Sequence, residues 1–380
     1  MKQNEQNTTS YSFDENDWNR AAYTDIEKFI YDCLIQAGAD HKSADAVARS
    51  LVTTSLRGVD SHGIRLLPHY IKTLQGGRIN GKPKLTFQSL AASTGTVDAD
   101  HGFGQVAGYR AIDEAMAIAD KNGIGAVTVI NSSHFGAAGC YSLAAAEQGY
   151  LAIAICNSDK FVVAHDGIEP FHGTNPISFA APIIGEKPYL FDMATSSIPW
   201  NRVLQYGLID RPLPSDVAID DQGNVTTDAN QTNALLPLGG AEFGYKGAGL
   251  AGMCDVLSAV LTGMSLSHAM YSFTGPDFSK HRHLGQFFIV MKPEAFIPTE
   301  MFDAQLKAYL QALRNQPAKE GARVLAPGDR EWAVEEQRLK QGIPIDQAVW
   351  QIFSQLAKSL DVAPLQPVSG TVENNVIDSK

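Results

Sequence analysis

The sequence predicts an α+β protein in which helices from both ends of the chain enclose an inserted domain built on a mixed sheet. Apolar residues recur with helical spacing near the N-terminus and again after Pro298. Between these regions, short apolar runs rich in β-branched residues indicate strands. The glycine-rich stretch 102–108 has GxGxxxG spacing, one residue longer than the Rossmann fingerprint, so we expect a non-Rossmann sheet.

Each element follows from a local pattern. Helices are predicted at 23–37, where Gly38 suits the position after a C-terminus, then at 42–56, 67–74, 105–121, 137–148, 247–261, 302–313 and 345–360. Strands are predicted at 94–98, 126–131, 151–156, 177–181 and 189–192. Residues 207–240, rich in Pro, Asp and Gly, are predicted to be loop. The resulting division is a disordered tail at 1–17, a discontinuous helical domain at 18–84 plus 262–364, a sheet domain at 85–261 and a disordered tail at 365–380.

Composition excludes several classes of protein. Lys+Arg 30 against Asp+Glu 41 gives 30 − 41 = −11, which argues against a nucleic-acid partner. The four cysteines are far apart in sequence and have no zinc-ligand spacing, so we expect reduced, packed thiols and no metal site. The N-terminus lacks a signal-peptide apolar region and no stretch is long enough to span a membrane, so a cytoplasmic protein is expected.

The stretch Asp60-Ser61-His62-Gly63 is the strongest candidate for chemistry. A histidine at a helix exit suits proton transfer near neutral pH, and the Ser61 hydroxyl could fix the tautomer of the ring. The alternative is that Asp60 and Ser61 cap the next helix and His62 is a surface imidazole.

Two glycine- and alanine-rich stretches could hold a phosphate at a helix N-terminus. They are residues 131–139, NSSHFGAAG, and residues 244–249, GYKGAG. A serine N-cap in the first stretch and close helix packing in the second are equally compatible with the sequence.

Three further stretches carry polar groups at strand ends. Gly173–Pro176 could offer Thr174 to a ligand or form a simple turn, and residues 191–197, FDMATSS, suit a ribose or a helix cap. Residues 282–288 form a cationic turn before an apolar strand, which locally resembles an ordinary solvated turn.

In this order, the stretches resemble the malate/L-lactate/L-sulfolactate dehydrogenase family, which includes ureidoglycolate dehydrogenase and piperideine/pyrroline-2-carboxylate reductase. The resemblance covers residues 20–362. The matching segments are RGVDSHGIRLLPHY (57–70), NSSHFGAAGCY (131–141), GTNPISFAAP (173–182), FDMATS (191–196), GYKGAGLA (244–251), HLGQFFIVMKP (283–293) and APGDREW (326–332).

The resemblance implies an NAD(P)-dependent 2-hydroxyacid dehydrogenase with a non-Rossmann, largely antiparallel cofactor domain at 85–261. It also implies a small anionic substrate and a homodimer with the active site near the interface. His62 would be the general acid/base, oriented by Ser61, with His134 a second candidate. Substrate contacts would include Arg65, Thr174 and Arg202. The implied cofactor contacts are His134, Phe135, Gly136, Ala137, Ala138, Asp192, Met193, Ala194, Lys246, Gly247, Arg282, Leu284 and Gly285. NAD is preferred to NADP, although the sequence has no Rossmann-type acidic residue to decide.

Three departures from the family pattern fall near the expected site. The family places an arginine five residues after Ser61, where this chain has Leu66, with Arg65 one position earlier. Arg202 replaces a lysine beside Trp200, and residues 241–244 lengthen a turn. The substrate therefore stays open between a 2-oxo acid and a cyclic imino acid, and a non-catalytic nucleotide-binding relative is a further alternative.

Overall fold

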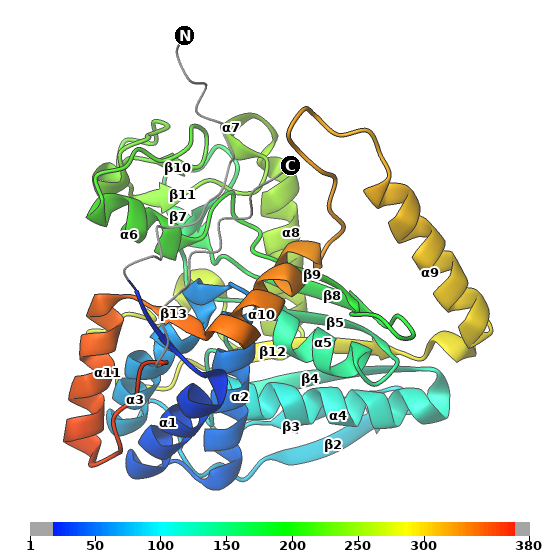
Figure 1. Ribbon diagram of the computed structural model, residues 1–380, viewed down its shortest axis with the longest axis horizontal. Helices are drawn as coiled ribbons and strands as arrows, with labels where there is room; N and C mark the ends of the chain where they lie inside the picture. The colour runs from blue at the N-terminus through cyan, green and yellow to red at the C-terminus, as the bar shows by residue number, and fades with distance from the viewer. Residues whose placement is uncertain (1–17, 369–380) are drawn as a thin grey trace, which may run out of the picture.

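A seven-stranded sheet forms the centre of the protein (Figure 1). The computed structural model describes residues 18–368, so the predicted tail at 1–17 and residues 369–380 lie outside the described part. The strands run in the order β2 (Thr86–Ala91), β3 (Thr94–Asp98), β4 (Ile124–Ser132), β12 (Leu284–Met291), β5 (Leu151–Cys156), β8 (Ile177–Ala181) and β9 (Tyr189–Met193). Only the β3–β4 pair in this sheet is parallel, which confirms a mixed, largely antiparallel sheet.

Helices cover both faces of this sheet. α4 (Gly104–Asn122) and α5 (Gly139–Ala146) share a buried cluster with β4 and β12. α8 (Tyr245–Asp255), which continues as a π-helical turn at Val256–Val260, packs on the other face. The helical domain predicted from the sequence included residues 262–364, which contain β12. In the structure, β12 belongs to the large sheet and lies at its centre, because its backbone pairs with both β4 and β5.

The helical part joins segments from both ends of the chain. α1 (Tyr23–Gln36), α2 (His41–Leu56), α3 (Leu67–Gln75) and α11 (Gln347–Leu360) share one buried core. The blue and red helices lie side by side in Figure 1. Beside them lie α10 (Asp329–Gln341) and the antiparallel pair β1 (Asn19–Ala21) and β13 (Ile343–Ile345).

The predicted disordered tail at 365–380 is wrong for residues 365–368. Leu365 packs against the helical core, and the Val368 N–H donates to the Arg20 carbonyl at 2.7 Å. This hydrogen bond to the start of β1 orders the chain at this point.

A smaller lobe lies above the helical part in Figure 1. It contains α6 (Trp200–Leu208), α7 (Gly240–Phe243) and a four-stranded sheet in the order β10 (Ala218–Ile219), β11 (Ala234–Leu235), β6 (Val162–Val163) and β7 (Pro170–His172). The predicted loop 207–240 thus contributes two short strands, which pair with each other, and β11 also pairs with the distant β6.

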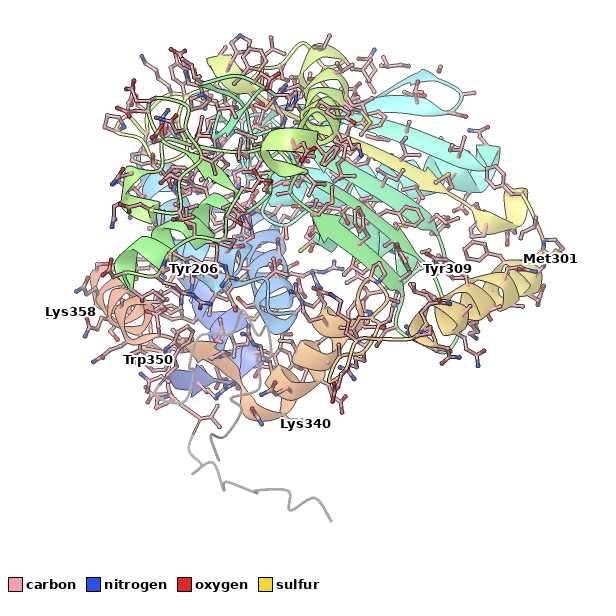
Figure 2. All side chains as sticks on the ribbon, turned by 90° about the horizontal axis from the view of Figure 1, so that it is seen from above. Tyr206, Met301, Tyr309, Lys340, Trp350 and Lys358 are labelled. Carbon is pink, nitrogen blue, oxygen red and sulfur yellow. The ribbon has the colours of Figure 1, made fainter. Side chains whose placement is uncertain are left out.

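One helix stands apart from the others. α9 (Thr299–Arg314) lies at the far side of the sheet domain from α11, as the labelled Tyr309 and Trp350 show in Figure 2. Across residues 18–368, no helix has the length and apolar character needed to cross a membrane.

Candidate active site

A cavity of about 740 Å³ lies where the helical part, the large sheet and the small lobe meet. Its lining includes many of the predicted site residues: Ser61, His62, His134, Phe135, Gly136, Ala137, Ala138, Thr174, Asp192, Met193 and Ala194. The fold therefore brings together residues from four separate sequence motifs.

The turn that carries His62 is held by close packing. The Ile64 N–H donates to Ser55 Oγ at 3.0 Å, and a Cβ at position 63 would lie only 2.0 Å from that oxygen. Glycine is therefore required in the SHG motif because α2 approaches too closely for a side chain. On the other side of His62, Asp60 accepts two hydrogen bonds from Arg338 of α10 at 2.7 and 2.9 Å.

Two histidines lie side by side in the cavity lining. The ring centroids of His62 and His134 are 5.8 Å apart, and Ser61 Oγ lies 3.0 Å from His62 Nδ1. Burial lowers the pKa of His62 to about 4 and holds the pKa of His134 well below its usual range, with His62 and Arg282 adding to the effect on His134. Both rings are therefore neutral at pH 7.

A chain of hydrogen bonds links Gln105 and Tyr70 to His134. Gln105 Nε2 donates to Tyr70 Oη at 2.7 Å, and Tyr70 Oη lies 2.8 Å from His134 Nδ1. With Gln105 donating to it, Tyr70 Oη can donate its own proton to His134 Nδ1, and this arrangement places the proton of the neutral ring on Nε2.

The stretch 131–139, predicted to hold a phosphate at a helix N-terminus, ends at the start of α5. α5 begins at Gly139, and its first N–H donates to Asp192 Oδ2 at 2.8 Å, so a carboxylate of the chain occupies this helix N-terminus. Enclosure by protein raises the pKa of Asp192 to about 6, against the lowering effects of this hydrogen bond and of Arg57. Asp192 faces the open cavity and is positioned to meet a bound molecule.

Arg65 and Leu66, which follow the Ser61-His62-Gly63 (SHG) motif, have different surroundings. Arg65 forms an ion pair with Asp346, the N-cap of α11, and its guanidinium lies 5.6 Å from the ring centre of Trp18. Leu66, at the family's arginine position, lines the cavity and is buried. Arg202 lies on α6 next to the lining residue Asn201 but is itself outside the lining.

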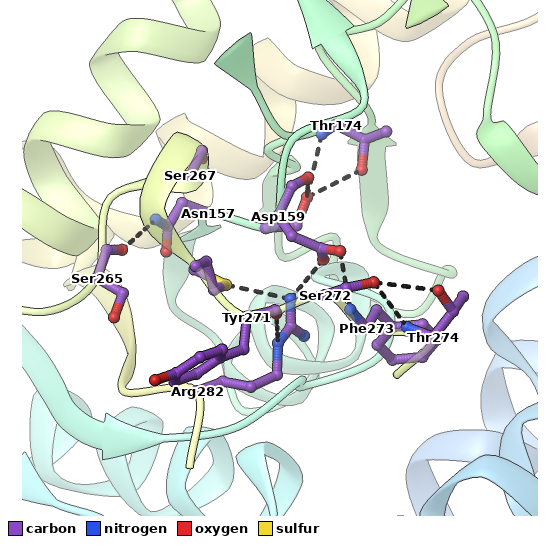
Figure 3. Close-up of polar contacts among 12 residues, drawn as sticks. Asn157, Asp159, Thr174, Ser265, Ser267, Tyr271, Ser272, Phe273, Thr274 and Arg282 are labelled. Carbon is purple, nitrogen blue, oxygen red and sulfur yellow. Dashed lines mark hydrogen bonds and ion pairs between the residues drawn. The ribbon is translucent and has the colours of Figure 1, made fainter. Parts of the chain in front are cut away.

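Arg282 is buried below the cavity and is not part of a solvated turn (Figure 3). It forms an ion pair with Asp159 and donates through Nε to the Tyr271 carbonyl at 2.9 Å. Asp159 Oδ2 in turn accepts from the Phe273 N–H at 2.8 Å. Arg282 thus holds the segment that presents Phe273 to the cavity.

The remaining predicted cofactor contacts lie outside the lining. Lys246 is exposed and sits near the rings of Phe243 and Tyr245. Gly247 and Gly285 allow close packing, since a Cβ would lie 2.4 Å from Leu238 N and 1.7 Å from Ser258 O, respectively. Leu284 is buried in the core of the sheet domain, with a relative exposure of 1%.

Sequence reasoning missed several residues of the site. Arg57, Tyr70 and Gln105 belong to matched or helical segments, but nothing in their local pattern marks them as functional. Asn157 is almost fully buried and contributes to the cavity lining, and its buried Oδ1 has no hydrogen-bond partner in the described residues. These roles arise from contacts between segments that are distant in sequence.

Comparison with known proteins identifies the class. The family model described as malate/L-lactate dehydrogenase matches residues 21–353. Malate dehydrogenase from Pyrococcus horikoshii is 37% identical over 89% of this chain and 94% of its own length. Its solved structure superimposes with a TM-score of 0.84, at 35% identity, over 94% of this chain and 99% of that one.

Two further relatives differ in the substrate that they are named for. Ureidoglycolate dehydrogenase (NAD(+)) from Escherichia coli K12 is 33% identical over 86% of this chain and 92% of its own length. The structure of delta1-piperideine-2-carboxylate reductase from Pseudomonas syringae pvar. tomato has a TM-score of 0.78, at 29% identity, over 89% of this chain and 99% of that one.

The fold and the family match define an oxidoreductase of the hydroxy-acid dehydrogenase class, which uses a nicotinamide cofactor. The chain belongs to the malate/L-lactate dehydrogenase family.

Proposed function

We propose that this protein interconverts a small 2-oxo acid and the corresponding 2-hydroxy acid in the cavity between His62 and His134. The observation that carries the proposal is the pair of neutral imidazoles, 5.8 Å apart, on the wall of a cavity that also contains Asp192. When bound, the nicotinamide ring of the cofactor supplies or accepts the hydride.

His62 is the proposed acid/base. As a neutral ring it takes the proton of the substrate hydroxyl during oxidation, and the protonated ring returns it during reduction. Ser61 orients the ring through Nδ1. His134 carries its proton on Nε2, because Tyr70 donates to Nδ1, so we assign it as a hydrogen-bond donor to the substrate oxygen.

The residues present fit a nicotinamide cofactor. The segment Phe135–Ala138 and the strand end at Asp192, Met193 and Ala194 would hold it, since these residues line the cavity and the glycine and alanines among them leave room for close approach. We favour NAD over NADP, in line with the named cofactor of the ureidoglycolate relative.

Of the predicted substrate contacts, the proposal keeps Thr174. Arg65 is left out because its charge is paired with Asp346, and Arg202 because it lies outside the lining. The predicted cofactor contacts Lys246, Gly247, Arg282, Leu284 and Gly285 are left out for the same spatial reason.

We infer a homodimer in the cytoplasm. The apolar residues Met253, Val256, Val260 and Leu261 form an exposed surface, 40% to 61% exposed, along α8 and the turn after it. Burial of such a surface between two copies would remove it from water. The four cysteines are free and buried, as predicted, which suits a reducing compartment.

Reduction of a cyclic imino acid is the second candidate, supported by the structural similarity to the piperideine-carboxylate reductase. Consumption of NADH and NADPH, measured with a panel of 2-oxo acids and with piperideine-2-carboxylate, separates the two candidates. Turnover of 2-oxo acids, with NADH the better cofactor, is expected. Turnover restricted to the imino acid would contradict the main proposal.

A further inference from the structure

The cavity has an apolar wall beside the two histidines. It consists of Leu66, Phe161, Trp200, Leu204 and Phe273, all of which line the cavity. The Phe161 and Trp200 rings are stacked with centroids 5.2 Å apart, and the Phe273 ring lies 4.8 Å from that of His134.

The wall is held next to the proposed acid/base. Asn201 Nδ2 donates to the Ser61 carbonyl at 3.0 Å, which ties α6 to the turn that carries His62. Trp200 and Leu204 are on the same helix, so this hydrogen bond fixes two wall residues relative to the reacting centre.

Positive charge lies elsewhere in the lining. Of the lining residues in the described chain, Arg57 and Arg330 are the two arginines, and lysine is absent from the set. Arg57 Nη2 lies 3.6 Å from Cys140 Sγ at the start of α5, near Asp192, and Arg330 is paired with Glu331 at 2.7 Å. Arg65, adjacent in sequence to Leu66, forms an ion pair with Asp346.

We infer that the substrate carries an apolar, branched or aromatic side group on the carbon next to the reacting carbonyl, and no second carboxylate. This inference rests on the proposed function of the same cavity. A second carboxylate against this wall would lose its water without gaining an ionic partner, whereas an apolar group would be stabilised by burial.

The test compares phenylpyruvate and 2-oxo-4-methylpentanoate with oxaloacetate, measured as kcat/KM with NADH. The wild-type protein is expected to prefer the apolar acids by at least about tenfold, the order expected for a side-group mismatch in a binding site. Leu66→Arg is expected to move the preference toward oxaloacetate, while Leu66→Met, which conserves volume and polarity, keeps the wild-type order.

A second variant keeps the inference testable even if Leu66→Arg does not fold. Trp200→Ala removes one ring of the wall and is expected to lower kcat/KM for phenylpyruvate more than for pyruvate. A wild-type preference for oxaloacetate, or ratios unchanged in both variants, would overturn the inference but leave the proposed function intact. Absence of turnover with every 2-oxo acid would instead contradict the proposed function, and this inference with it.

Discussion

Arg338 binds Asp60 through two hydrogen bonds of 2.7 and 2.9 Å, so a residue near the C-terminus positions the turn that carries His62. The Arg338 side chain is only 6% exposed, and that of Asp60 is 29% exposed. This ion pair joins α10 to the end of α2, which explains how helices from opposite ends of the chain build one site.

Arg338→Met should remove this ion pair while keeping most of the side-chain volume. We expect the free energy of unfolding to fall by about 2–3 kcal/mol, less than for a fully buried pair because Asp60 is partly exposed. Chemical denaturation measures this change. Lys340→Met, on the exposed side of the same helix, is the control, and an equal loss in both variants would contradict the role of the pair.

His62→Gln should reduce kcat by about 10²–10⁴-fold, the usual contribution of a positioned acid/base. Cofactor binding should stay close to wild type, because the cofactor contacts proposed above lie on other segments. Steady-state kinetics and NADH titration by fluorescence measure the two effects separately. Turnover similar to wild type would rule out His62 as the acid/base.

The low pKa of His62 predicts an unusual pH dependence. Oxidation needs the neutral ring, so kcat/KM for the hydroxy acid should stay level as the pH falls through 6.5 and decline only toward about 4. A pH–rate profile in the oxidative direction measures this. A decline centred near 6.5 would show that His62 titrates like an exposed histidine.

The same pKa links stability to pH. Between pH 6.5 and about 4 the unfolded chain binds a proton at this position and the folded chain does not, so acid favours unfolding. The difference in Tm between pH 7 and pH 4.5 should be smaller in His62→Gln than in the wild type. An identical difference would contradict this linkage.

Tyr70→Phe should remove the hydrogen bond that favours one tautomer of His134. In the wild type, nitrogen NMR of histidine-labelled protein should show His134 protonated on Nε2, because Tyr70 donates to Nδ1. The variant should show a mixture of tautomers and a kcat lowered about tenfold, with little change in KM. A wild-type ring protonated on Nδ1 would reverse the proposed direction of the hydrogen-bond chain.

Val256→Asp combined with Val260→Asp should weaken the proposed dimer, since two charges would enter an apolar interface. Size-exclusion chromatography with light scattering is expected to show a dimer for the wild type and a monomer for the variant. Ile352→Asp, an exposed apolar position on α11, serves as the control. A monomeric wild type would contradict the dimer directly.

Local patterns predicted most of the regular elements. The predicted strands at 151–156 and 177–181 agree with β5 and β8, because their β-branched and apolar residues fit a buried sheet. The helix at 42–56 agrees with α2 within one residue. α6 and α10 were missed, and the sequence pattern did not reveal that β12 lies between β4 and β5, since strand order depends on pairing between distant segments.

The candidate site, like the fold, was predicted only in part from the sequence. The sequence predicted His62, His134, Thr174 and Asp192 as site residues, and the fold gathers all four around one cavity. It did not reveal the Gln105–Tyr70 contact to His134, because these residues come together only through packing.

By itself, the sequence determined most of the helices, five strands of the large sheet, the SHG turn and the family to which the chain belongs. Only the tertiary structure decided what each charged side chain does. Arg65 and Leu66 are adjacent in the chain, but Arg65 pairs with Asp346 while Leu66 faces the cavity. The physical reason is that a charge binds the partner that folding brings near it, and that partner is 281 positions away in the sequence.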